Sequence, residues 1–191
     1  MSTSLRAEPA IVAVRKKSEH MPTKSKTYPR HHRSEVDVDA QAQVLFAHLD
    51  DHRRLAGHME KPSLMMAGAT MRVETDALQG QAVGSVIRIT GRVLGMKLAV
   101  DEVVSERVPP LRKTWETSGE PRLLVIGSYR MGFTITALGD RSRLVVFIDY
   151  QLPTSGFAHG LALLFGRTYA AWCTRQMTTD AVKAFGGKAA R

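Results

Sequence analysis

Two tyrosines are the first candidates for chemistry in this sequence. Tyr129 begins the alternating stretch 129–135, and Tyr150 ends the alternating stretch 144–150. Side chains two positions apart on a strand share a face, so each tyrosine is expected to point to the same side as its apolar neighbours. A hydroxyl in apolar surroundings can orient a ligand or transfer a proton. The alternative is that both rings are ordinary core residues with their hydroxyls at the rim.

Two tryptophans could complete an apolar binding surface. Trp115 and Trp172 are flat and large, so either could form a wall against the ring of a ligand. Plain core packing explains them equally well. Glu116 follows Trp115 and therefore points to the opposite face, which favours a solvated carboxylate over a general base.

Charged residues and histidines offer two further hypotheses. Arg88, Thr90 and Arg92 stand at alternate positions, so they share one strand face and could hold a carboxylate or a phosphate. A solvated strand face is the simpler interpretation. His52 and His58 could transfer protons near neutral pH, although no carboxylate stands in a regular spacing to either, which favours surface histidines.

The sequence contains no pattern of metal ligands or of a phosphate-binding loop. His31 and His32 are adjacent, which directs them to opposite sides of a strand, and Cys173 is the single cysteine. The stretch 80–85 lacks the Lys-Ser/Thr ending of a P-loop. A thiol on a mostly apolar helix has a raised pKa and is usually inert. We therefore predict no metal and no cofactor.

Most of the positive charge is concentrated near the N-terminus. The 191 residues have a net charge of +9, and residues 1–33 contain eight Lys or Arg and two acidic residues. A segment with so little apolar content cannot offset the entropy of ordering it. We expect a disordered basic leader over residues 1–29, which could contact an anionic membrane weakly. No aromatic ladder accompanies the charges, so specific nucleic-acid binding is not expected.

The apolar segments are too short for export or for crossing a membrane. Residues 9–14 fall short of the roughly 7–15 apolar residues of a signal peptide. Residues 156–173 include His159 and Arg167 and fall short of the ~20 apolar residues that a bilayer requires. One cysteine fits a reducing compartment, so we expect a cytoplasmic protein.

The elements that position these residues form one α+β domain over residues 30–187. Residues 34–39 alternate as a half-exposed strand. A short helix is predicted at 40–49 with Asp39 as its N-cap, and a second short helix at 51–58. Turn residues then divide the chain up to residue 151 into about six strands with short links, which indicates an antiparallel meander.

One long helix is predicted to close the domain. Residues 156–185 contain no proline, and Gly186 and Gly187 mark the end, followed by a flexible tail at 188–191. Six residues of this helix fall at a period of 3.6 and form a stripe that the sheet must cover. They are Phe157, Leu161, Leu164, Phe165, Thr168 and Trp172.

This order of elements is similar to the START-like or polyketide-cyclase-like superfamily, also called SRPBCC. The resemblance covers roughly residues 33–185 and rests on the passages 36–40, 91–95 and 103–110 and on the closing helix. It implies a helix-grip fold, in which a curved antiparallel sheet of about seven strands wraps around a long C-terminal helix. The passages mark positions in a fold, and none is a catalytic signature.

The resemblance also implies a cavity between the sheet and the C-terminal helix. Members of the superfamily use it for lipids, sterols, polyketides, quinones or other apolar ligands. Combined with the patterns above, it predicts these ligand-binding residues: Trp115, Tyr129, Phe133, Tyr150, Leu161, Phe165, Thr168 and Trp172.

Three functions are compatible with such a cavity. The first is a carrier or sensor of a small hydrophobic ligand such as a lipid, polyketide or isoprenoid, held by apolar burial at about 25 cal/mol per Å². The second is an enzyme of the cyclase or aromatase kind, in which Tyr129, Tyr150 or a histidine moves protons. The third is a partner-binding module whose pocket is filled by its own side chains. Because the superfamily includes carriers and enzymes, the resemblance leaves the choice open.

Overall fold

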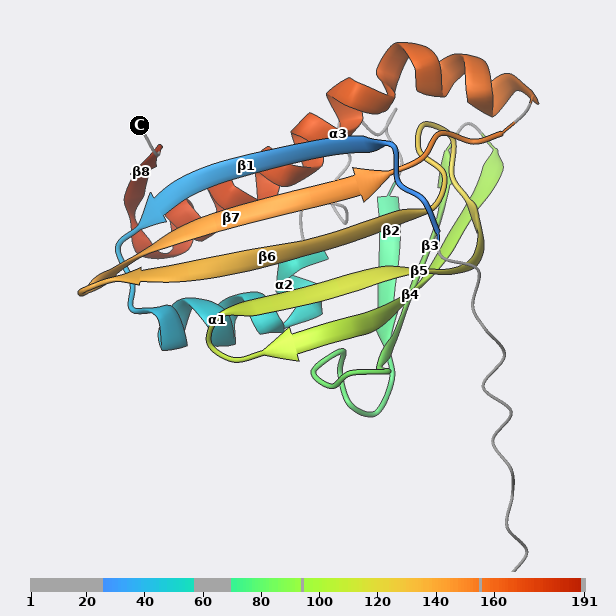
Figure 1. Cartoon of the computed structure of the whole chain (residues 1–191). Helices are drawn as coiled ribbons and strands as arrows, with labels where there is room; N and C mark the ends of the chain where they lie inside the picture. Colours follow the sequence, from blue (N-terminus) through green and yellow to red (C-terminus); the bar gives the residue numbers. More distant parts are fainter. Residues whose placement is uncertain (1–25, 57–69, 94, 155, 190–191) are drawn as a thin grey trace, which may run out of the picture.

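The computed structural model describes residues 26–56, 70–93, 95–154 and 156–189 (Figure 1). The chain begins with strand β1 (Arg30–Val38) and helices α1 (Ala42–Asp50) and α2 (His52–Ala56). The following strands are β2 (Thr70–Thr75), β3 (Val86–Val93), β4 (Met96–Val108), β5 (Arg112–Arg122), β6 (Tyr129–Leu138) and β7 (Arg141–Tyr150). Helix α3 (Gly156–Phe185) and the short strand β8 (Gly187–Ala189) close the described chain.

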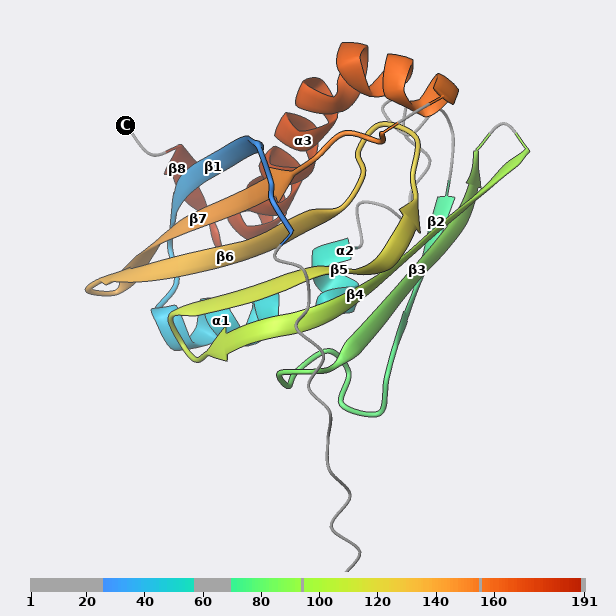
Figure 2. The ribbon, with the colours of Figure 1, turned by 45° about the vertical axis from the view of Figure 1, so that its right-hand side comes forward.

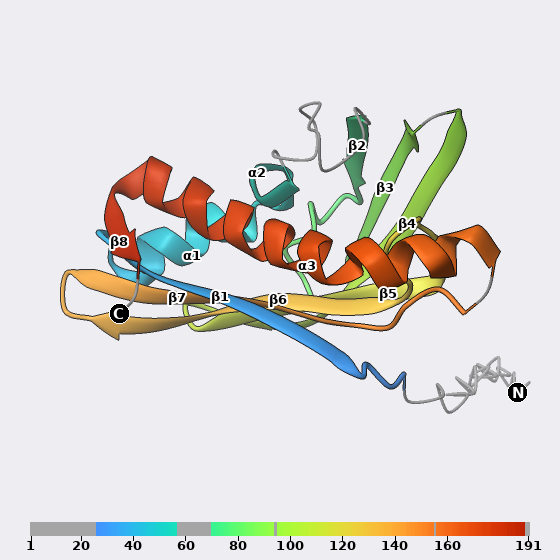
Figure 3. The same ribbon diagram turned by 90° about the horizontal axis from the view of Figure 1, so that it is seen from above.

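The strands form a single curved antiparallel sheet. Its order is β2-β3-β4-β5-β6-β7-β1-β8, so the meander from β2 to β7 is extended at its β7 edge by β1 and β8. The helices lie on one side of this sheet, and α3 crosses it (Figures 1 and 3). The α+β helix-grip architecture expected from the sequence is confirmed. The additional strand β8 replaces the start of the predicted flexible tail.

Alternating side chains build the core, as the sequence predicts. Tyr129 of β6 pairs with Tyr150 of β7, and the ladder continues to Leu138 and Arg141. The odd-numbered positions from Tyr129 to Ile135 and the even-numbered ones from Leu144 to Tyr150 are buried. The sheet also bends strongly at β4, whose pairing with β5 shifts register between Ala99 and Asp101 and between Val104 and Glu106. Such bulges increase local twist, and Figure 2 shows β2 to β4 turning away from the rest of the sheet.

Small residues form the face of α3 that packs on the sheet. A Cβ added at Gly166 would lie 2.9 Å from the carbonyl oxygen of Val125, which shows how closely the helix approaches the segment between β5 and β6. Helix α3 packs mainly on β1 and β7. The buried residues of this face include Ala162, Gly166, Ala170, Cys173, Thr174, Met177, Thr178 and Ala181.

The predicted apolar stripe of α3 is therefore wrong. Three of its large side chains are mostly exposed, at 72%, 73% and 50% for Phe157, Leu164 and Phe165. Thr168 is exposed as well, and Leu161 and Trp172 are only partly buried. Several of the stripe's residues stand one position before a residue of the packed face, and one residue turns an α-helix by about 100°. The prediction assumed that the large apolar side chains face the sheet. The helix lies so close to its neighbours that only small side chains fit on the packed face.

The start of the domain also differs from the prediction in detail. Strand β1 begins at Arg30, and the N-cap of α1 is Gln41 and not Asp39, without a side-chain capping bond. Of the predicted leader, residues 1–25 lie outside the described residues. Lys26 donates to the backbone carbonyl of Thr117, and the Tyr28 hydroxyl lies 3.5 Å from Glu116, so residues just before β1 contact β5. In the described part of the chain, no helix has the length and apolarity that crossing a membrane requires.

A buried charge cluster joins α1 to the sheet. Asp50, at the end of α1, lies 2.9 Å from the Lys113 ammonium and 2.7 Å from the Arg107 guanidinium. The Lys113 side chain is fully buried and also donates to the Asp50 carbonyl at 2.8 Å. A buried lysine needs such partners because an isolated charge in the interior is strongly unfavourable. The cluster thus anchors the helical segment on β4 and β5.

Candidate functional site

A narrow pocket lies between the sheet, α2 and α3. Its volume is about 50 Å³. Pockets for drug-sized ligands measure about 300–1,000 Å³, so this pocket is much smaller than a whole lipid requires. Its walls are largely apolar, and five residues with titratable side chains contribute to them: His52, Glu102, Tyr129, Tyr169 and Cys173.

Glu102 places a carboxylate on an otherwise apolar face of β4. It stands between the two register shifts of the strand, and its same-face neighbours Val100 and Val104 are buried. The residue is only 2% exposed. One carboxylate oxygen lies 3.0 Å from Nε2 of His52, and the other accepts a hydrogen bond from the Tyr129 hydroxyl. Glu102 is therefore held by two side chains that come from α2 and β6.

His52 presents one ring nitrogen to the carboxylate and keeps the other without a partner. Because the hydrogen on Nε2 is donated to Glu102, Nδ1 of a neutral imidazole is an acceptor with a free lone pair. Nδ1 is buried, and no described residue hydrogen-bonds to it. The ring packs edge-on against Trp115, with centroids 4.9 Å apart. The expectation of a surface histidine is wrong, since His52 is 2% exposed; His58 lies outside the described residues.

The hydroxyl and thiol groups of the pocket are held in their protonated forms. Burial raises the pKa of Tyr129 well above its ordinary value, and the nearby Glu102 adds to the rise. Burial also raises the pKa of Tyr169, with a contribution from Cys173. Burial raises the pKa of the Cys173 thiol to about 12, so little of it is thiolate near neutral pH. The two tyrosines are therefore hydrogen-bond donors near neutral pH.

The structure brings two of the predicted ligand-binding residues to this pocket. Trp115 and Tyr129 line it. Phe133 is fully buried and packs edge-on against Trp115, with centroids 6.4 Å apart, while Tyr150 is 2% exposed. These two are core residues that do not line the pocket. The predicted residues of α3 do not line it either: Leu161, Phe165, Thr168 and Trp172.

Sequence reasoning missed the carboxylate at the centre of the site and the helix residues that cover it. Glu102 had a usable signal, because it interrupts the apolar positions Val100 and Val104 on one strand face. On α3 the pocket is covered by Tyr169, Cys173 and Met177, which follow each other at intervals of four residues. These three residues form a stripe that is as regular as the predicted one and lies next to it on the helix surface.

Comparisons with known proteins support the fold. The sequence matches no known family profile and no curated protein. Among solved structures, TTHA0849 from Thermus thermophilus has a TM-score of 0.58 at 14% identity, covering 81% of this chain and 95% of that one. The Zhui aromatase/cyclase from a Streptomyces species has a TM-score of 0.56 at 18% identity, covering 81% and 90%. A truncated norcoclaurine synthase from Thalictrum flavum has 0.53 at 15%, covering 81% and 92%.

These structures have the same architecture as this chain. Their identities are low, so the likeness concerns the fold and not an activity. The chain has the helix-grip fold, which is the fold that the resemblance seen in the sequence implied.

Proposed function

We propose that this protein binds a small, largely apolar molecule in the pocket between the sheet and α3. The observation that carries the proposal is the buried set His52–Glu102–Tyr129 within apolar walls. Ligand pockets combine apolar surface with a few placed polar groups that fix orientation. The unpartnered Nδ1 of His52 can accept a hydrogen bond from a hydroxyl or amide group of such a ligand.

The size of the pocket restricts what can enter it. A volume of about 50 Å³ admits a group of a few heavy atoms. Met131 and Met177 line the pocket, and methionine side chains change rotamer at small cost, so both can make room for a larger ring. We therefore expect a compact cyclic molecule with one polar group, carried or sensed without being changed.

Native mass spectrometry and thermal unfolding test this binding function. Freshly purified protein should retain a small-molecule adduct, or phenols, aromatic ketones and terpenoid alcohols should raise its thermal midpoint. A ligand at 100 times its Kd stabilises the folded state by about 2.7 kcal/mol. Tyr129→Phe should weaken binding, because it removes a donor that orders the polar set. Tyr150→Phe is the matched control, since Tyr150 does not line the pocket.

A negative result would favour the third function of the sequence analysis. If no adduct is retained and no member of the library raises the midpoint, the pocket is filled by the protein's own side chains. The domain would then act as a partner-binding module.

A second candidate function is proton transfer by an enzyme of the cyclase or aromatase kind. The specific observation is the geometry of the His52–Glu102 pair, since the carboxylate holds Nε2 of His52 while Nδ1 has no hydrogen-bond partner among the described residues and can accept a proton. The proton would move from an acidic C–H group next to a substrate carbonyl to Nδ1. Tyr129, held protonated, would keep Glu102 in place as a donor.

Deuterium exchange separates the enzyme from the carrier. For an enzyme, a bound ketone should exchange its acidic hydrogen in D₂O, and His52→Gln should slow this exchange by about 10²-fold or more while binding persists. Equal exchange rates in the wild type and in His52→Gln would exclude this role and leave the carrier function.

A further inference from the structure

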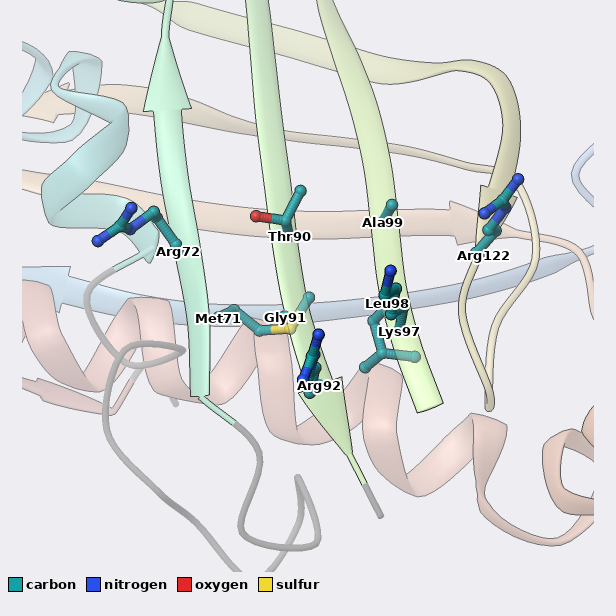
Figure 4. A pocket seen from close by; sticks show the side chains of 9 residues that line it. All are labelled: Met71, Arg72, Thr90, Gly91, Arg92, Lys97, Leu98, Ala99 and Arg122. Atoms are coloured by element: carbon teal, nitrogen blue, oxygen red, sulfur yellow. The ribbon is translucent and has the colours of Figure 1, made fainter. Parts of the chain in front are cut away.

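A second, open pocket lies at the end of the sheet formed by β2, β3 and β4 (Figure 4). Its volume is about 860 Å³, and it shares no lining residue with the pocket around Glu102. Four basic residues line it and no acidic residue does: Arg72, Arg92, Lys97 and Arg122. Met71 and Leu98 also line it, although both pair with Gly91 and so belong to the face opposite Arg92 and Lys97. The buried Met71 side chain extends toward Gly91 of β3 (Figure 4).

Two of these cations face each other directly across a strand pair. Arg92 of β3 is the register partner of Lys97 of β4. Both side chains are exposed. Like charges at directly opposite positions of an antiparallel pair are destabilising, so this arrangement costs folding free energy unless an anion lies between them.

The lack of a partner carboxylate distinguishes the basic residues of this pocket from the other arginines of β3 to β7. Within the described part of the chain, none of the four basic side chains has a hydrogen bond or an ion pair. The other arginines of β3 to β7 all form a salt bridge: Arg88 with Asp101, Arg107 with Asp50, Arg112 with Glu106, Arg130 with Asp149, Arg141 with Asp39 and Arg143 with Asp37.

The sequence hypothesis for this region changes accordingly. Arg88 lies 2.8 Å from Asp101 and is already neutralised. Thr90 and Arg92 of the same strand face do line the pocket. The anion-binding group is thus Arg92 with Lys97 and not Arg92 with Arg88.

We propose that this pocket binds a soluble amphiphile with a phosphate or carboxylate group. The anion contacts Arg92 and Lys97, where guanidinium and ammonium groups form charge-assisted hydrogen bonds to oxyanions. A short apolar part lies against Ala99 and the aliphatic stems of the basic side chains, which share the sheet face of Arg92 and Lys97. The site is separate from the proposed pocket at Glu102 and involves a different class of ligand.

Isothermal titration with hexyl phosphate and with inorganic phosphate at low ionic strength tests the proposal. Hexyl phosphate should bind more tightly, because its chain adds apolar contact. The double variant Arg92→Gln/Lys97→Gln should weaken its binding at least about tenfold. The control Arg112→Gln/Arg130→Gln removes the same charge from exposed, carboxylate-paired positions and should change binding less than about twofold.

Three results would overturn the proposal. Hexyl phosphate could fail to bind, or both double variants could weaken it equally, which would indicate a general charge effect. Binding could also be confined to phosphatidylcholine vesicles that contain phosphatidic acid, which would indicate a membrane contact. A cooperative urea transition with a native baseline for the wild type and both variants would establish that the comparison concerns folded protein.

Discussion

The carboxylate of Glu102 is nearly sealed from solvent, and two side chains stabilise it. His52 and Tyr129 supply its hydrogen bonds, and the three residues come from α2, β4 and β6. A buried polar group is tolerated in proportion to how completely it is hydrogen-bonded. A single substitution in this set therefore leaves a buried polar group without its hydrogen bond.

Replacing Tyr129 by phenylalanine tests this dependence. The change removes one of the two donors to Glu102, so we expect the free energy of unfolding to fall by about 1–3 kcal/mol. Urea unfolding at neutral pH measures it. Tyr150→Phe should cost less, because no described residue hydrogen-bonds the Tyr150 hydroxyl. Equal losses in the two variants would mean that the bond to Glu102 contributes nothing to stability.

Helix α3 packs through small residues and leaves large ones at the surface. Its contact face contains Gly166 and Ala170, and its opposite face presents Leu164 and Phe165. A helix that lies close to its neighbours leaves no room for bulky side chains on that face, so its backbone makes the contacts instead. Two pairs of substitutions within this one helix test the assignment of its faces.

The first pair compares two glycines. A Cβ at Gly160 meets no atom within 4 Å, whereas one at Gly166 would lie 2.9 Å from the Val125 carbonyl oxygen. Gly160→Ala should therefore stabilise the protein by about 0.5–1 kcal/mol through helix propensity. Gly166→Ala should destabilise it, because the backbone must shift. Thermal unfolding measures both, and a gain in both variants would contradict the close contact.

The second pair compares two large apolar residues. Met177 is 3% exposed and lines the inner pocket, whereas Leu164 is 73% exposed. Met177→Ala should lower the free energy of unfolding by about 2–5 kcal/mol, the usual range for emptying a core position. Leu164→Ala should change it by less than about 0.5 kcal/mol. A larger loss of stability for Leu164→Ala in urea unfolding would indicate that the stripe predicted from the sequence is the face that packs.

At the scale of the whole molecule, the cluster of Asp50, Lys113 and Arg107 connects the helices to the sheet. Burial lowers the pKa of Lys113, and the hydrogen bond and charge of Asp50 oppose this change. For Asp50, burial by itself would raise the pKa, but the hydrogen bonds from Arg107 and Lys113 outweigh it and lower the pKa below 3.8. Folding and ionisation of Asp50 are therefore linked.

Asp50→Asn should reveal this linkage. A carboxyl group whose pKa is lower in the folded state stabilises the protein at pH values above its unfolded-state pKa. That stabilisation is lost as the pH falls through the folded-state pKa. We expect the variant to be about 3–5 kcal/mol less stable at neutral pH, since a buried lysine loses its counterion. The difference should shrink below pH 3.8, the ordinary value for Asp50.

Urea unfolding at neutral and acidic pH measures this difference. Asp140→Asn is a suitable control because Asp140 is exposed in the turn between β6 and β7. A gap between the wild type and Asp50→Asn that stays constant into acid would rule out ionisation of Asp50 as its cause.

Local patterns in the sequence determined the elements and the inward positions of the strands. The alternation around Phe133 and Val146 predicted which side chains of β6 and β7 are buried, and the glycines after residue 185 marked the end of α3. Such patterns are short-range, because the period of 2 or 3.6 follows from backbone geometry alone. The order of these elements carried the resemblance to the superfamily, and that resemblance implied the helix-grip fold.

Only the tertiary structure decided how these elements meet. The period of α3 identifies candidate faces, but the face that packs depends on how close the sheet comes, which local periodicity does not encode. In the same way, His52 and Glu102 are 50 positions apart and meet because α2 lies over a bent β4. The charge of each residue was visible in the sequence, while its burial and its partner depend on contacts between distant segments.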